Sequence, residues 1–261
     1  MNEVVDLAFW QILAAYIFVL ILIVIVKLKK IPREKEIVLA TTRMTLQLVL
    51  VGYILVYVFD NAHPMYTLII ISIMQFFAIY NIYKRTKYKL DLEMKKIIAF
   101  SMMVGILSSL LFFVFIVLNL SPWYEPRYFI PIAGMIIGNS MTGISLGVNN
   151  LHIGMIDQKD KIEGALMLGA TPKMASNKVI NQAFDAAMLP TINSMVGMGI
   201  IFLPGMMTGQ ILSGTSPVVA IEYQIAVMLG IVGSVSLSVI IYLHLGYKVF
   251  FNSRSQLKRN V

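Results

Sequence analysis

Polar side chains inside long apolar runs are the residues of this sequence that could contact a solute. Five of them are candidates for a transport path: Arg43, Gln47, Gln75, Asn139 and Asn193. Amide oxygens can replace part of the hydration shell of a cation, and such residues often mark a pathway through a membrane. Arg43 and Gln47 are four residues apart and therefore share one face of a helix, so both could line the same path.

Each of these side chains also has a purely structural interpretation. Arg43 lies about one turn into its apolar run, so its charged group can extend back to the lipid headgroups. Gln75 and Asn139 are expected near the middle of their runs, and Asn193 near the cytoplasmic start of its run. Amides in such places hold helices together by hydrogen bonds worth about 1 kcal/mol each. Both interpretations remain open.

Methionine and histidine are the other possible metal ligands, because the chain has no cysteine. Met206 and Met207 belong to a methionine-rich run, and thioethers suit soft ions such as cuprous copper. The alternative is that methionine is a flexible apolar filler. His63, His152 and His244 are far apart in the sequence and form no group with carboxylates. No preformed metal site is predicted with these residues.

The composition is that of a multi-pass membrane protein. Hydrophobic residues make up 58% of the 261 residues and charged residues only 13%, about half of the share in a soluble domain. Runs of about 20 apolar residues without period-two alternation predict spanning helices rather than a barrel. We predict an all-α polytopic protein with a single domain, residues 1–261, and about seven spans: 7–26, 38–59, 65–83, 97–119, 128–148, 190–212 and 218–243.

Basic residues predict the orientation of these spans. Of the 21 Lys and Arg residues, 19 lie in four connections on one side: 27–37, 84–96, 149–189 and the tail after 243. Cytoplasmic loops carry such an excess, so the N-terminus is predicted outside and the C-terminus in the cytoplasm of a cell-membrane protein. The net charge of +8 then indicates contact with anionic membrane lipid and no nucleic-acid partner.

The cytoplasmic segment of about 150–189 carries polar residues at helical spacing between two apolar spans. Within it, "EGALMLGATP" predicts a short helix that ends at Gly169 and Pro172, followed by a second helix from about 173 toward Pro190. Two short helices cannot bury themselves. They therefore either lie on the membrane face as amphipathic helices or bind a partner protein.

This segment resembles the EAA loop of ATP-binding-cassette (ABC) transporter permeases. Together with "RMTLQLVLVGYIL", "GNSMTGISLGVNNL" and "LPGMMTGQILSGTSPVVAIEYQI", it makes residues 37–250 similar to the FetB-type (UPF0014) permeases, a family linked to iron export, and to plant aluminium-tolerance permeases. The resemblance implies the membrane subunit of an ATP-driven exporter of iron or a related metal species. In such permeases the loop folds into a coupling helix that docks on the ATPase subunit.

The resemblance assigns the coupling role to named positions of this sequence. They are Glu163, Gly164, Ala165, Gly169, Ala170 and Pro190. Small residues allow close approach of a partner, and Glu163 offers a charge for pairing at the rim. Gly164 stands where the family pattern has its first alanine, which is a departure from that pattern.

The sequence contains no phosphate-binding string Gly-x-x-x-x-Gly-Lys-Ser/Thr. We therefore expect a transport subunit rather than an enzyme, without a cofactor of its own. By the resemblance, ATP binds to a separate cytoplasmic ABC ATPase subunit, and a complete transporter needs two permease chains, which implies a homodimer.

Two other transport functions remain as alternatives. An ABC importer permease for another small solute would have the same coupling loop but would work with an extracellular binding protein. An ion-coupled secondary transporter usually carries acids at mid-membrane or inverted halves, and neither is evident here. A membrane enzyme has no support, because the sequence shows no paired acids and no Ser–His grouping.

Overall fold

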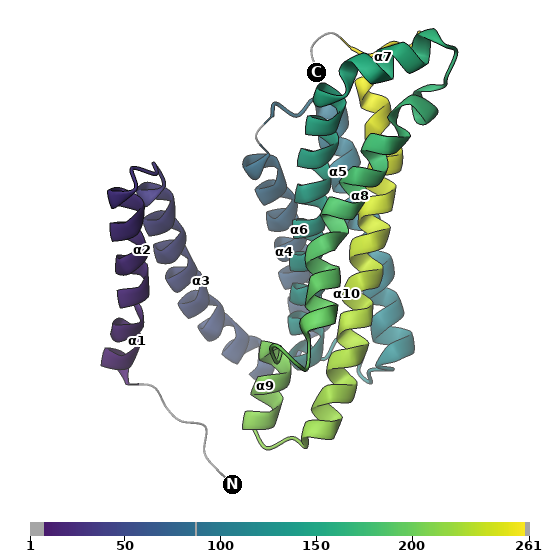
Figure 1. The fold of residues 1–261 in the computed structure, drawn as a ribbon. Coiled ribbons are helices and arrows are strands. Elements are labelled where there is room, and N and C mark those ends of the chain that lie inside the picture. Colours follow the sequence, from purple (N-terminus) through teal and green to yellow (C-terminus); the bar gives the residue numbers. More distant parts are fainter. Residues whose placement is uncertain (1–7, 87, 259–261) are drawn as a thin grey trace. The chain divides into compact units, whose positions relative to one another are not determined.

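The computed structural model describes residues 8–86 and 88–258, and contacts divide the chain into two units. The first unit comprises Met1–Ala62 with Leu212–Gly214, and the second comprises His63–Ile211 with Thr215–Val261. Each unit is described by itself. The described part of the chain is almost entirely helical (Figure 1), which confirms the prediction of an all-α membrane protein.

The first unit is a pair of long apolar stretches joined by a short turn. Its helices are α1 (Phe9–Ala15), α2 (Ile17–Leu28) and α3 (Glu34–Asp60). Tyr16 separates α1 from α2, and its hydroxyl is hydrogen-bonded to the Oγ1 of Thr45 on α3. Residues Phe9–Leu28 have a mean hydropathy of 2.8 over the best window, so this stretch is suited to lipid.

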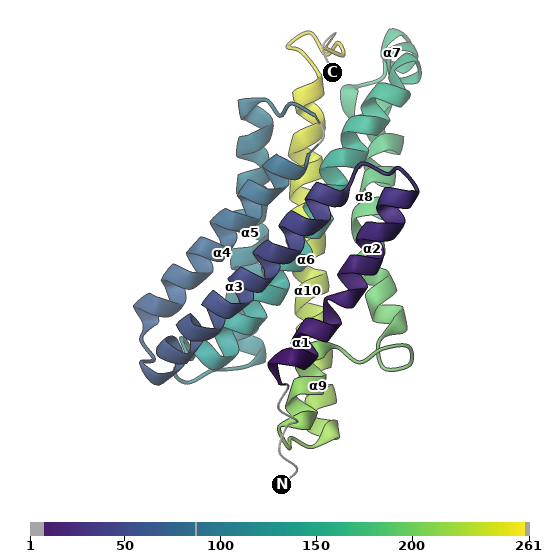
Figure 2. The ribbon, with the colours of Figure 1, turned by 90° about the vertical axis from the view of Figure 1, so that its left-hand side faces the viewer.

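The described part of the second unit is a bundle of five long helices with a short helix at each end (Figures 1 and 2). Its elements in chain order are α4 (Pro64–Arg85), α5 (Leu92–Phe112), the π-helical turn Phe113–Val117, α6 (Pro126–Asp157), α7 (Lys159–Met167), α8 (Pro172–Gly197), α9 (Gly205–Leu212), α10 (Pro217–Gly246) and the 3₁₀ turn Tyr247–Phe250.

Helix α6 lies at the centre of this bundle and contacts α4, α5, α8 and α10. Ile132, Ile136, Ile144 and Leu151 on α6 are fully buried, and their spacing of four, eight and seven residues follows one helical face. This face packs into the core of the unit, whereas most other long helices keep a lipid-facing side.

Within residues 8–86 and 88–258, six helical stretches are long and apolar enough to cross a membrane, so the chain is a multi-pass membrane protein. The count of seven spans and their orientation stay predictions. The predicted helix over 190–212 was wrong in its bounds: α8 begins at Pro172, ends at Gly197, and is separated from α9 by residues 198–204. Pro204 and Gly205 stand at the start of α9, directly after the irregular segment.

The helix of the predicted fifth span does not end near 148, because α6 continues to Asp157; the boundary of the span itself stays a prediction. The polar residues Asn149 and Asn150 do not stop the helix. Their side-chain amides donate to the carbonyls of Ser145 and Leu146, four residues earlier, at 2.9 Å each. This local bonding gives both side-chain NH2 groups a partner within the helix, although the Oδ1 of Asn149 is buried without one among the described residues.

Candidate functional site

The short helix α7 has the length and the ending that the sequence predicts. Gly169 has φ +90°, a left-handed conformation that favours glycine. The amide of Gly169 donates to the carbonyl of Leu166 at 3.0 Å, and the amide of Ala170 donates to that of Ala165 at 3.0 Å. These two hydrogen bonds form a Schellman motif, which ends α7 sharply.

The next helix begins immediately after this turn. The Oγ1 of Thr171 accepts a hydrogen bond from the amide of Met174 at 3.3 Å, and Pro172 occupies the first helical position of α8. The string Gly-Ala-Thr-Pro therefore encodes a helix stop, a two-residue turn and a helix start. It makes the α7–α8 connection compact and well defined.

One side of α7 is fixed to the bundle and the other projects outward. Ile162 is fully buried in the core, and Leu166 packs partly against it. In contrast, Met167 and Leu168 at the tip are 86% and 91% exposed, and Met174 in the first turn of α8 is 70% exposed. Three large apolar side chains so exposed outside a spanning helix indicate an interaction surface. We call Met167, Leu168 and Met174 the apolar tip.

The predicted coupling residues of α7 lie beside the apolar tip. Glu163 is half-buried and its carboxylate lies 3.9 Å from the Nζ of Lys159. A methyl group added at Gly164 would meet no heavy atom within 4 Å, so this position faces open space. Ala165 and Ala170 are half-buried. A partner could therefore approach the α7 backbone closely at this surface.

Pro190 is the predicted coupling residue that does not share this surface. It lies inside α8, 18 residues after Pro172 at the start of that helix. At 1.5 Å per residue this places it about 27 Å along the helix axis from the turn. Pro190 is therefore distant from the α7–α8 turn, as the predicted helix from about 173 toward Pro190 implies, and its coupling role stays a prediction.

Asn139 and Asn193, two of the predicted path residues, lie on helices that pack together. A methyl group at Gly154 on α6 would meet Val179 on α8 at 2.5 Å, and one at Gly147 would meet Ala187 at 3.6 Å. The two helices are therefore antiparallel.

If the same pairing of residues continues along both helices, Asn139 on α6 lies at the level of Asn193 on α8. Both side chains are exposed. Asn193 lies near the end of α8 at Gly197, so its expected position at the start of a span was wrong. The two amides form a polar level on the α6–α8 pair.

Gln75 on α4 has the least satisfied side chain among the predicted path residues. Neither its Nε2 nor its Oε1 has a hydrogen-bond partner among the described residues, although both atoms are buried. The side chain lines a groove of about 360 Å³ between α4 and α5, whose other walls include Ile79, Met103 and Leu107. An amide without partners in such surroundings costs free energy, so a further polar group is expected to meet it.

The remaining predicted path residues lie in other places. Arg43 is half-buried and Gln47 exposed on α3, in the first unit. Met206 and Met207 are adjacent on α9, where Met207 is buried and Met206 half-buried. The register of α6 and α8 places Asn139 and Asn193 at a similar level, and no described contact joins either of them to the methionines.

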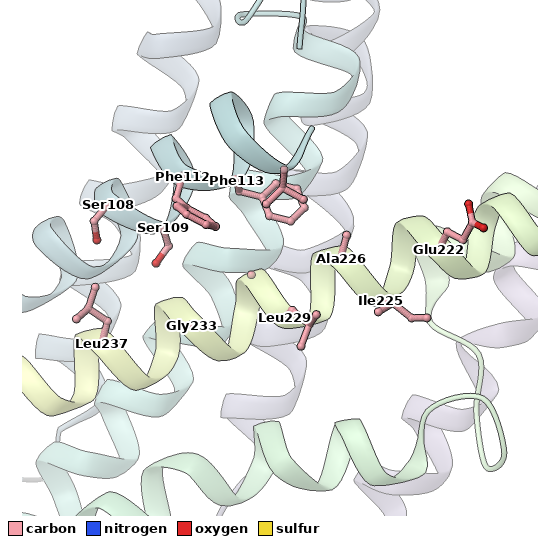
Figure 3. A pocket seen from close by; sticks show the side chains of 12 residues that line it. Ser108, Ser109, Phe112, Phe113, Glu222, Ile225, Ala226, Leu229, Gly233 and Leu237 are labelled. Atoms are coloured by element: carbon pink, nitrogen blue, oxygen red, sulfur yellow. The ribbon is translucent and has the colours of Figure 1, made fainter. Parts of the chain in front are cut away.

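A second groove, of about 620 Å³, lies between α5 with its π-helical turn and α10. Figure 3 shows that Glu222 stands at one end of it and Ser108 and Leu237 at the other. Its middle is apolar, with Phe112 and Leu229 among the lining side chains. None of the predicted path residues lines this groove. The groove has a single carboxylate, that of Glu222 at one end, and does not form a polar route.

Two serine contacts at the centre of the bundle were missed by sequence reasoning. The Oγ of Ser140 on α6 lies 3.0 Å from the Oγ of Ser234 on α10. Ser238, one turn further along α10, is fully buried beside Gly105 on α5. The available signal was the spacing of small residues at four-residue intervals on α10, which favours close packing of membrane helices.

Comparisons with known proteins place the whole chain in one family. A family model described as "Uncharacterised protein family (UPF0014)" matches residues 9–251. The chain is 39% identical over 243 residues to "Probable iron export permease protein FetB" of Escherichia coli (strain K12), covering 93% of this chain and 92% of that protein.

Two further relatives are similar over nearly their full length. "UPF0014 membrane protein YjkA" of Bacillus subtilis (strain 168) is 35% identical, with 94% of this chain and 96% of the relative covered. "Protein ALUMINUM SENSITIVE 3" of Arabidopsis thaliana is 32% identical, with 95% and 89% covered. No solved structure matches the chain significantly. With its helical spans and this full-length similarity, the chain belongs to the UPF0014 family of membrane proteins.

Proposed function

We propose that this chain is the membrane permease subunit of an ATP-driven exporter, and that its cargo is iron or a related metal species. The observation that carries the proposal is the α7–α8 connection, with a rigid turn at Gly169 that holds the exposed apolar tip beside Glu163. Such a surface suits a partner protein better than water, because its large apolar side chains remain unburied in the single chain.

The energy source in this proposal is a separate subunit. The sequence lacks the Gly-x-x-x-x-Gly-Lys-Ser/Thr string that binds nucleotide phosphates, so ATP would be bound and hydrolysed by a cytoplasmic ABC ATPase. Two copies of this chain would assemble with two ATPase subunits. Residues Glu163, Gly164, Ala165, Gly169 and Ala170 would contact the ATPase and transmit its closure to the spans.

The cargo is proposed from the relative named as a probable iron export permease in Escherichia coli. Among the described residues, no three His, Asp or Glu side chains gather closely enough to hold a metal ion. The proposal therefore treats the metal as a passing substrate that contacts amide oxygens, with Asn139, Asn193 and Gln75 as the candidates. Weak contacts of this kind suit an exporter, because the cargo must be released on the far side.

The test is assembly with the ATPase and the stimulation of its ATP hydrolysis in lipid. Glu163→Arg reverses the charge at the surface, and Leu168→Asp places a charge in the apolar tip without affecting the core. Both variants are expected to lose co-purification or stimulated hydrolysis. Val218→Asp is the matched control, because Val218 is 64% exposed at the start of α10, at the opposite end of the second unit from α7 (Figure 1).

Unchanged assembly and hydrolysis in both variants would contradict the proposal. The α7–α8 connection would then be an amphipathic element on the membrane face. An ion-coupled secondary transporter would become the leading alternative. Loss in Val218→Asp as well would indicate a general effect of added charge rather than a docking surface.

A further inference from the structure

The end of the chain after α10 folds into a small hairpin, residues 251–258, which we call the C-terminal hairpin. Phe251 and Leu257 form an antiparallel bridge. The Oδ1 of Asn252 accepts hydrogen bonds from the amides of Arg254 and Gln256, at 2.9 Å each. The amide of Asn252 in turn donates to the carbonyl of Gln256 at 2.9 Å. These bonds define one conformation for a polar segment.

Apolar side chains fix this hairpin to the bundle. Phe250, Phe251 and Leu257 are all at least 92% buried and belong to the core of the second unit. The amide of Lys258 also donates to the carbonyl of Phe250 at 2.9 Å. Polar chain ends are normally poorly ordered unless they are tied down in this way. The exposed side chains of the hairpin are therefore held in fixed positions.

A groove of about 1100 Å³ separates the C-terminal hairpin from α7. Both elements lie at the same end of the second unit (Figures 1 and 2). The walls of the groove are Glu163, Leu166, Met167 and Ala170 from α7 and its turn, Asn252, Arg254, Ser255, Gln256, Leu257 and Lys258 from the hairpin, and Asp91 before α5. The groove is therefore continuous with the apolar tip through Met167.

The charges of the groove are separated between its walls. Glu163 and Asp91 are acidic, whereas Arg254 and Lys258 on the C-terminal hairpin are basic. Among the described residues no ion pair joins the acidic and the basic wall, since Glu163 pairs only with Lys159 on its own helix. The side chain of Asp91 makes no capping hydrogen bond to α5. Such a groove complements a segment that carries both a basic and an acidic side chain.

We propose that the C-terminal hairpin is the second wall of the ATPase docking site and that the groove receives a charged segment of the ATPase subunit. This inference rests on the proposed function, because it assumes that α7 contacts an ATPase. Within the proposed function, the inference assigns a docking role to the C-terminal hairpin, which is not among the coupling residues predicted from the sequence. The ATPase segment would present a basic group to Glu163 and Asp91, and an acidic group to Arg254 and Lys258.

The test is photo-cross-linking from single cysteines, which is clean because the natural chain has no cysteine. A benzophenone maleimide is attached to Ser255→Cys, to Leu168→Cys or to Lys248→Cys, in the full chain in lipid. The cross-linking partner is the ATPase that co-purifies with the wild-type chain and is then purified. A peptide that contains its phosphate-binding loop identifies it as an ATPase. Lys248 is the matched control, because it is exposed beside the hairpin but does not line the groove.

We expect Ser255→Cys to cross-link to the ATPase about as efficiently as Leu168→Cys, and Lys248→Cys much less. Cross-linking from Leu168→Cys alone would overturn this inference and leave the proposed function standing. No cross-link from either position would overturn both. Cross-links from Ser255→Cys only to lipid or to a second copy of this chain would also overturn the inference.

A charge reversal gives an independent readout of the same surface. Arg254→Glu should weaken ATPase binding about tenfold or more, because like charges would then face each other across the interface. The exposed control Lys248→Glu should change binding by less than about twofold. Binding that is equal in the two variants would overturn the assignment of the groove.

Discussion

Gly105 on α5 lies directly against Ser238 on α10. A Cβ atom at Gly105 would be 2.1 Å from the Oγ of Ser238 and 2.8 Å from its Cα. The second of these atoms belongs to the backbone, so the contact cannot be relieved by turning a side chain. The close approach of two long helices at the centre of the bundle therefore depends on the missing side chain of Gly105.

Gly105→Ala is accordingly expected to destabilise the protein by about 1 to 3 kcal/mol, because the two helices must separate. The measurement is thermal unfolding in detergent. Gly233→Ala on α10 is the control, since a methyl group there would meet no heavy atom within 4 Å. Equal unfolding temperatures of the two variants would contradict the close packing described here.

Gly169→Val should disturb the turn between α7 and α8, because a β-branched residue is strained at φ +90°. We expect a cost of about 1 to 2 kcal/mol at the turn and a loss of stimulated ATP hydrolysis. The bundle itself should unfold at nearly the wild-type temperature. Gly164→Ala, where a methyl group meets no atom, should keep both properties. Full stimulation by Gly169→Val would argue against a rigid coupling turn.

Gln75→Leu separates a transport role from a packing role. Because both amide atoms of Gln75 are buried without a partner among the described residues, an apolar side chain should be neutral or stabilising in the single chain. If Gln75 contacts the cargo, transport should fall at least about tenfold while the unfolding temperature holds or rises. A large fall in stability would instead identify a structural hydrogen bond in the assembled protein.

Asn139→Leu and Asn193→Leu test the polar level on α6 and α8. Both side chains are exposed, so neither change should lower the unfolding temperature by more than a few degrees. Each should reduce metal transport without changing assembly with the ATPase. Ile192→Leu is a matched control, because Ile192 is exposed beside Asn193 on α8 and stays apolar. Normal transport in both asparagine variants would remove them from the path.

The sequence was sufficient for the all-α membrane class and for the α7–α8 turn. Gly169, Thr171 and Pro172 each favour the backbone conformation or the capping position that they occupy at this turn. These preferences are local and do not depend on the rest of the fold. Spans whose apolar run is clearly more hydrophobic than the flanking sequence, such as Phe9–Leu28, were also predicted close to their bounds.

Features that depend on distant parts of the chain could not be predicted. Helix α8 crosses from polar to apolar sequence without a local signal for where it ends, so Asn193 was expected at the start of a span and instead lies near the end of α8. The groove between α7 and the C-terminal hairpin joins residues about 90 positions apart, Glu163 and Arg254 among them. Only the packing of Phe251 and Leu257 into the core brings these segments together.

The central claim is that this chain exports a metal with energy from a separate ATPase. The direct test reconstitutes the chain in liposomes, adds the ATPase, ATP and radioactive iron outside, and measures iron in the lumen. We predict accumulation that requires both ATP and the ATPase, is lost in Leu168→Asp, and persists in Val218→Asp. Iron entry that needs neither ATP nor the ATPase, or no entry with both present, would contradict the account.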